Sequence, residues 1–236
     1  MAERELSHGA LMALFPVVAA QGLWVRRRTP RLPEADGRRG TFGPGTNPLS
    51  VAVVGDSVAA GTGIADHRQT IAGQLARRLH LRYGRPVAWS VVAQGGLTAG
   101  EVVTLLEGHD EVARANFVVV SVGVNDTKDL HSDSRWTDEL TTLLLSVCGQ
   151  AQVVLLGVPP METLPALPQP LARLLGDRAR RLDRLGSEVA AGVDGVHHLS
   201  LRDLDLDLEG AHARDGFHPS EQVHAELARR IDVLLA

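Results

Sequence analysis

Short runs of valine and leucine alternate with longer segments of helical period along most of this chain. The runs show little apolar–polar alternation, as expected for strands covered on both faces. Strands are expected at Ser50–Val54, Val87–Ala93, Phe117–Val122, Val153–Val158 and Val196–Leu201. Apolar residues at three- and four-residue spacing predict helices at Thr70–Tyr83, Ala99–Glu107, Asp133–Cys148, Leu171–Ala191 and Ser220–Leu235.

A strand-helix alternation of this kind implies a parallel sheet joined by right-handed crossovers. We therefore predict a flavodoxin-like three-layer α/β/α sandwich with a five-stranded parallel sheet. In such a fold, ligands bind beyond the carboxyl ends of the strands. The 236 residues are enough for one folded domain of this type, which we place at residues 49–236.

The first 48 residues have a different character. An apolar run from Ala10 to Val25 is broken by Pro16 and followed by three arginines, the reverse of the charge order in a secretory signal. It is also shorter than the ~20 residues that a spanning helix needs. Two interpretations stay open: a leader or a helix packed on the domain, and an interfacial anchor that places residues 10–28 peripherally on a membrane. In both, the domain is expected in the cytoplasm.

Residues 29–48 are rich in proline, glycine and arginine and are expected to be a linker. The overall charge of the chain is -4, which provides no electrostatic reason to expect a nucleic-acid partner. Its single cysteine, Cys148, forbids an internal disulfide and falls in an apolar helical stretch, as a small core residue would.

A serine follows the first expected strand at once, in the triplet Gly55-Asp56-Ser57. This position puts Ser57 at the carboxyl edge of the sheet, in a turn that Gly55 allows to be tight. A serine hydroxyl is a weak nucleophile unless a base lies beside it. Taken alone, Ser57 would more simply cap the next helix.

Asp215 and His218 provide such a base. Three residues apart in a turn, the aspartate can reach one imidazole nitrogen and fix the tautomer, leaving the other nitrogen to take the serine proton. Pro219 then opens the last helix. An ordinary surface ion pair is the alternative. Among the ten histidines, His218 alone combines an aspartate partner, a turn and a helix start.

Acyl transfer also needs donors aimed at the oxyanion that forms on the carbonyl. Gly96 follows the second expected strand, and its N–H can approach a substrate closely. Asn125 follows the third and offers a side-chain amide, while the N–H of Ser57 is a third donor. Singly, these residues would form a plain turn and an Asx turn or helix cap. The ends of three strands meeting at one edge favour a site.

Together, Gly55-Asp56-Ser57, Gly95-Gly96, Gly123-Val124-Asn125-Asp126 and Asp215-Gly216-Phe217-His218 resemble, in this order, the blocks of the SGNH (GDSL) hydrolase family. The resemblance covers about Leu49 to Ala236. It implies catalytic roles for Ser57, Asp215 and His218 and an oxyanion hole of Ser57, Gly96 and Asn125. It also implies a structural role for Asp56. Gly96 is preferred to Gly95 because Gly96-Leu97-Thr98 matches the Gly-x-Thr form of that block.

One departure concerns the second block, which in the family often has an asparagine a few residues upstream. Here Val91-Val92-Ala93-Gln94 occupies that place, so the sequence does not identify a hydrogen-bonding partner for this loop.

The resemblance implies a GDSL-type serine esterase that hydrolyses small carboxylic esters through an acyl-enzyme, without a cofactor. A thioesterase or a lysophospholipase is possible within the same family. From another class, a catalytically silent ligand-binding domain on the same fold stays open. A Gly-x-Ser-x-Gly elbow of α/β-hydrolases is disfavoured because the serine here follows the first strand.

Two further segments carry candidate binding residues. After the fourth strand, a proline-rich loop carries Met161, Leu164 and Leu167, which would form either a wall of the acyl pocket or a packed surface connection. The alternating carboxylates Asp203, Asp205 and Asp207 have Leu208 where a calcium loop requires glycine, so no metal is expected there.

Overall fold

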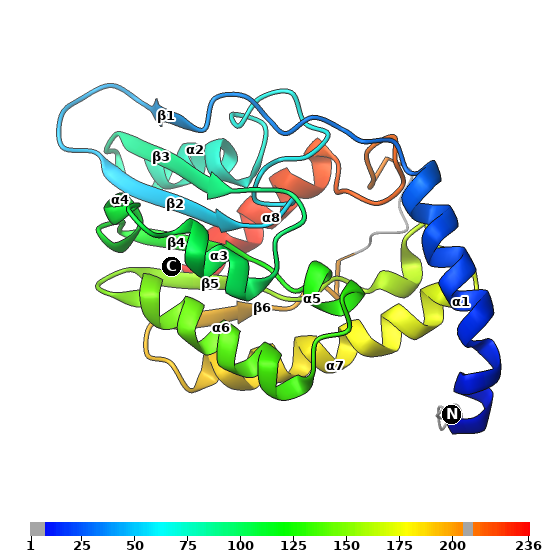
Figure 1. Ribbon diagram of the computed structural model, residues 1–236. Coiled ribbons are helices and arrows are strands. Elements are labelled where there is room, and N and C mark those ends of the chain that lie inside the picture. The colour runs from blue at the N-terminus through cyan, green and yellow to red at the C-terminus, as the bar shows by residue number, and fades with distance from the viewer. Residues whose placement is uncertain (1–7, 205–209) are drawn as a thin grey trace.

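A sheet of six strands lies between two layers of helices in the computed structural model, which describes residues 8–204 and 210–236 (Figure 1). The strands are β1 (Arg39–Phe42), β2 (Leu49–Gly55), β3 (Val87–Ala93), β4 (Phe117–Ser121), β5 (Gln152–Leu156) and β6 (Val196–Leu199). Their order in the sheet is β1-β3-β2-β4-β5-β6. Strands β2 to β6 are parallel, and β1 pairs with β3 in the antiparallel sense.

Side chains of the central strands alternate between two cores, as the pleat of a strand requires. From β2, Ala52 and Val54 enter one core and Val51 and Val53 the other. The first core packs against α3 (Ala99–Leu105), α6 (Asp133–Cys148) and α7 (Leu171–Ala191). The second packs against α2 (Ile71–Tyr83) and α8 (Glu221–Leu234). The predicted three-layer α/β/α architecture is thus confirmed.

The predicted strand count of five was wrong, because the described residues form six. The additional strand, β1, lies in the segment expected to be a linker, and pairs through its backbone from Arg39 opposite Ser90 to Phe42 opposite Val87. It is short and mostly exposed. An edge strand of this kind buries no apolar face, so it leaves no apolar pattern in the sequence.

The shorter helical elements are α4 (Asp110–Ala113), α5 (Val124–Lys128) and the 3₁₀ turn η1 (Met161–Thr163). Of these, α5 begins directly after β4 and carries Asn125 at the carboxyl edge of the sheet.

Near the N-terminus, α1 (His8–Arg28) lies beside the start of α7 (Figure 1). The Gln21 side chain donates to the carbonyl of Gln169 at 2.6 Å and accepts the N–H of Leu171 at 3.1 Å. Val18 and Val25 pack against the first core. Within the described part of the chain, every helix is too short or too polar to cross a membrane.

Candidate active site

The turn after β2 is shaped by the close approach of β4. A Cβ atom on Gly55 would lie 1.9 Å from the carbonyl oxygen of Ser121, so only glycine fits there. The N–H of Asp56 donates to this same carbonyl at 2.9 Å. Its Oδ1 accepts the N–H of Val58 at 3.1 Å and the hydroxyl of Ser121 at 3.2 Å. Asp56 therefore braces the turn that presents Ser57.

Complete burial raises the pKa of Asp56 to about 7, even though the hydrogen bonds from Val58 and Ser121 act in the opposite direction. Both of these hydrogen bonds are made by Oδ1, and Oδ2 of Asp56 is buried without a hydrogen-bond partner among the described residues.

The Asp215 and His218 side chains form the pair expected from their spacing. Asp215 Oδ2 lies 2.6 Å from His218 Nδ1, and Oδ1 accepts the N–H groups of Phe217 and His218, each at 3.0 Å. Burial acts to raise the pKa of Asp215, but these three hydrogen bonds outweigh it and hold that pKa below its ordinary value. An ionised Asp215 fixes a proton on Nδ1, so Nε2 is free to accept another.

The loops that carry Ser57 and His218 lie against one another. A Cβ on Gly63, shortly after Ser57, would lie 3.1 Å from the Cβ of Ala213 in the histidine loop. One apolar cavity is lined by both Val58 and His218. The Ser57 hydroxyl makes no hydrogen bond to His218 in this structure; catalytic hydrogen bonds are often long without substrate and tighten when it binds.

Two backbone N–H groups at the site lack partners. Among the described residues, no acceptor bonds to the N–H of Ser57 or to that of Gly96. Gly96 has a φ of +94°, which favours glycine, and a Cβ added there would meet no atom within 4 Å. The Gly96 backbone therefore borders open space, as an oxyanion donor must.

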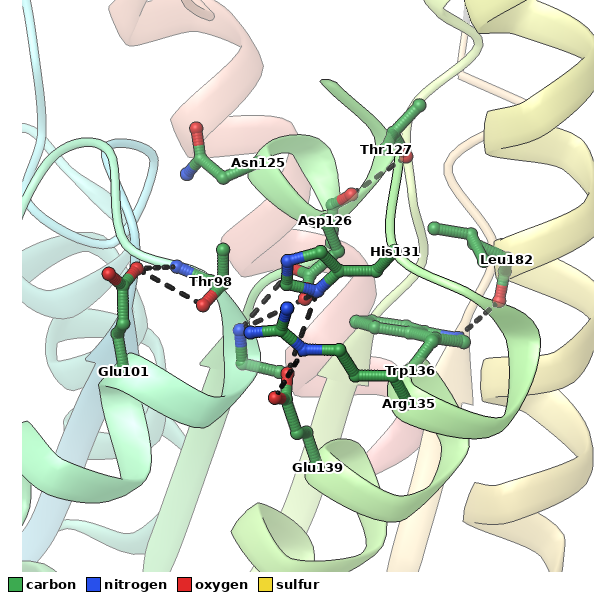
Figure 2. Close-up of polar contacts among 12 residues, drawn as sticks. Thr98, Glu101, Asn125, Asp126, Thr127, His131, Arg135, Trp136, Glu139 and Leu182 are labelled. Carbon is green, nitrogen blue, oxygen red and sulfur yellow. Dashed lines mark hydrogen bonds and ion pairs between the residues drawn. The ribbon is translucent and has the colours of Figure 1, made fainter. Parts of the chain in front are cut away.

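Asn125 lies in the first turn of α5 and is 4% exposed. Its Nδ2 donates to the carbonyl of Leu97 at 2.8 Å, which uses one of its two amide hydrogens. It thus joins α5 to the loop that contains Gly96. Figure 2 shows its side chain turned away from the polar cluster below it.

That cluster contains Asp126, His131 and Glu139 (Figure 2). His131 Nδ1 lies 3.2 Å from Asp126 Oδ1 and 3.6 Å from Glu139 Oε2. Both oxygens of Asp126 accept the N–H of Ala99, at 3.2 and 3.3 Å, and Arg135 Nε donates to Glu139 Oε1 at 2.8 Å. Burial raises the pKa of Asp126 against the opposing hydrogen bond from Ala99.

Among the described residues, these three side chains are the group with the spacing of metal ligands, since their ligand atoms lie within 4.8 Å of one another. The contacts present also constitute a polar network, in which Arg135 pairs with Glu139 and Nδ1 of His131 lies beside both carboxylates. Through Ala99, this network ties α5 and α6 to the start of α3, directly after the loop of Gly96.

The apolar cavity next to His218 lies beyond the carboxyl ends of β4 and β5. Its walls are mostly aliphatic or aromatic side chains, among them Val122, Leu164, Leu201, Phe217 and Val223.

The loop residues proposed for the acyl pocket divide between cavity and core. Leu164 lines the cavity, whereas Met161 is fully buried in the first core and Leu167 is half-buried against it. Asp205 and Asp207 of the acidic stretch lie outside the described residues.

Comparison with known proteins agrees with this arrangement. The model of the GDSL-like lipase/acylhydrolase family matches residues 53–226, which include all four motifs. The chain belongs to this family. The predicted resemblance is therefore confirmed.

Three proteins that resemble this family member are 15 to 26% identical to it. It is 26% identical over 183 residues to the GDSL-like esterase Rv1075c of Mycobacterium tuberculosis; the match covers 75% of this chain and 58% of that relative. It shares its fold with the lipase Lip_vut3 from a goat rumen metagenome, with a TM-score of 0.66 and 15% identity over 78% of this chain and 96% of that one. A lipase/acylhydrolase from Enterococcus faecalis has a TM-score of 0.62 and 21% sequence identity, over 79% of this chain and 95% of that one.

Proposed function

We propose that this chain is a serine esterase that hydrolyses carboxylic esters of small molecules through an acyl-enzyme intermediate. The observation that carries this proposal is the Asp215–His218 pair, which lies on a loop packed against the Ser57 turn. Family membership supports ester hydrolysis as the class of reaction, and the relative from M. tuberculosis bears the name esterase.

In the first half-reaction, Nε2 of His218 removes the proton of the Ser57 hydroxyl, and the oxygen attacks the ester carbonyl. The N–H groups of Ser57 and Gly96 and the second amide hydrogen of Asn125 stabilise the oxyanion. The tetrahedral intermediate formed by this attack then collapses and expels the alcohol, which takes its proton from His218. Throughout, Asp215 stays ionised and steadies the imidazolium, in keeping with its lowered pKa.

In the second half-reaction, water gives a proton to His218 and attacks the acyl-enzyme. The carboxylic acid leaves and Ser57 regains its proton. The apolar cavity that His218 borders would take the hydrocarbon part of the ester, because burial of apolar surface favours binding there.

A fluorophosphonate probe tests this proposal, because it reacts with an activated serine. The wild-type protein should be labelled, and Ser57→Ala should not. Ser146→Ala is a matched control, since that hydroxyl bonds to the Leu143 carbonyl within α6. Absence of labelling in the folded wild-type protein would point instead to a silent binding domain. If the wild-type protein is labelled, rates on a panel of esters, thioesters and lysophospholipids would distinguish the substrate classes.

We further propose that α1 rests on the surface of an anionic membrane. Val17, Leu23 and Trp24 are each about half exposed, and Arg26 to Arg28 follow them at the end of the helix. Exposed apolar side chains next to arginines suit the interface between lipid headgroups and acyl chains.

The doubly substituted variant Leu23→Glu/Trp24→Glu should therefore lose binding to vesicles of mixed neutral and anionic lipid in a sedimentation assay. The wild-type chain should sediment with the vesicles, and less so at high salt, because screening weakens the arginine contribution. Leu81→Glu is the control, since Leu81 is an exposed leucine on α2. A wild-type chain that stays in the supernatant would contradict this proposal.

A further inference from the structure

A glutamate far from the four motifs touches the loop of the oxyanion hole. Oε1 of Glu34 accepts the N–H of Gly95 at 2.7 Å. Its other oxygen, Oε2, accepts from Nη2 of Arg38 at 2.6 Å, and Nη1 of Arg38 donates to the carbonyl of Ala93 at 2.7 Å. One carboxylate thus links the Gly95 peptide to an arginine anchored at the end of β3.

Glu34 is held in place by the loop that follows the nucleophile. On either side of it, the carbonyl of Pro33 accepts the N–H of Gly63 at 2.8 Å, and the N–H of Ala35 donates to the carbonyl of Ala60 at 3.1 Å. Ala35 is buried. These backbone contacts fix the chain on both sides of Glu34, and its bonds to Arg38 and Gly95 then hold the carboxylate.

This carboxylate also lies near Ser57. The point where a Cβ would stand on Gly95 is 3.2 Å from Glu34 Oε1, 3.6 Å from the Cβ of Ser57 and 3.8 Å from the hydroxyl of Thr62. A bare carboxylate beside an oxyanion would oppose the reaction by like-charge repulsion. The ion pair with Arg38 offsets that charge, so Glu34 can serve as an acceptor without this penalty.

We propose that Glu34 is a positioning residue for the oxyanion hole, an inference that rests on the proposed esterase function. Its hydrogen bond fixes the Gly95 peptide, while Asn125 and Asp126 hold the other end of the loop through Leu97 and Ala99. The N–H of Gly96, between these tethers, is thereby kept free and fixed for the substrate. A donor fixed before the reaction stabilises an oxyanion more than a mobile one does.

Glu34→Ala should lower kcat for an ester by about 10- to 100-fold, less than the 10²–10³ typical of deleting an oxyanion donor, because the donor is loosened and not removed. KM should change by less than about threefold, since the hydrogen bond from the Gly96 N–H to the substrate oxygen strengthens mainly in the transition state. Glu34→Gln keeps an acceptor oxygen and should stay within about threefold of wild type in kcat.

Glu111→Ala is the matched control. Glu111 also pairs with an arginine, Arg39, at 2.5 Å, but it lies in α4, before β4 and thus at the amino ends of the parallel strands. Its kcat should equal that of wild type. Rates are expressed per active site, titrated to completion with a fluorophosphonate, so that partial unfolding does not imitate a slower reaction.

Amide hydrogen exchange of residues 94–98 provides a readout that is independent of activity, and it should be faster in Glu34→Ala than in Glu34→Gln. Unchanged kcat in Glu34→Ala, or equal losses in both Glu34 variants, would overturn the positioning role. Failure of the esterase proposal itself would be seen separately, as full activity in Ser57→Ala.

Discussion

Ser57→Ala and His218→Ala should each lower kcat by about 10⁴- to 10⁶-fold, and the double variant should be little worse than either. In the proposed mechanism, the nucleophile and the base act in one proton transfer, so removal of either removes the step. KM should change far less, because both variants keep the apolar side chains that form most of the cavity wall. Steady-state rates of the three variants on one soluble ester test this.

The fold should survive these substitutions. Ser57 makes no side-chain hydrogen bond to His218, and the Asp215 carboxylate keeps its two backbone donors when the imidazole is removed. Thermal midpoints of both single variants should therefore stay near that of wild type. Losses that multiply in the double variant would show that the two residues act independently, which contradicts a shared role in catalysis.

Asn125→Ala should lower kcat by about 10²- to 10³-fold, the loss typical of one oxyanion donor. KM should change little, because the amide interacts most strongly once the carbonyl has become an oxyanion. Asn125 is not a simple helix cap, since its Nδ2 donates to the carbonyl of Leu97. The variant also loses this hydrogen bond, so we expect a loss of about 1 kcal/mol in the free energy of unfolding.

A second hydrogen bond of the same helix separates the loss of kcat from the loss of stability. Thr127 is fully buried in α5, and its hydroxyl donates to the carbonyl of Gly123 at 2.8 Å. Thr127→Val removes a hydrogen bond of similar kind without removing an oxyanion donor. It should reduce stability to a similar extent and leave kcat per active site nearly unchanged. Similar kcat losses in both variants would show that α5 matters only as a support, and would exclude Asn125 as a donor.

Local patterns predicted the central elements because each forms where burial dominates. The strand over Val87–Ala93 and the helices over Asp133–Cys148 and Leu171–Ala191 match their predicted bounds, since a continuous apolar run or an apolar stripe ends where burial ends. The pair of Asp215 and His218 was predictable for a related reason. Two side chains three residues apart in one turn can adopt few arrangements, and the 2.6 Å contact between Asp215 Oδ2 and His218 Nδ1 is one of them.

The parts that the sequence did not reveal depend on contacts between distant segments. β1 forms by backbone pairing along β3, and backbone groups are the same for every residue. Glu34 reaches Gly95 across 61 positions, and its charged side chain looks like any solvated glutamate in the sequence. The Asp126–His131–Glu139 cluster depends on how the chain turns between α5 and α6, because His131 lies in that connection and contacts one residue of each helix.

The N-terminal contacts of Glu34 and β1 bear on where a working fragment of this protein can begin. The family match starts at residue 53, and a cut there would remove both the carboxylate bonded to Gly95 and the strand beside β3. A chimera of two relatives joined at residue 53 would combine the Gly95 loop of one protein with the Glu34 segment and β1 of the other. We therefore expect the shortest active fragment to begin near Leu32. A chimera should take Leu32–Phe42 from the same protein as the four motifs.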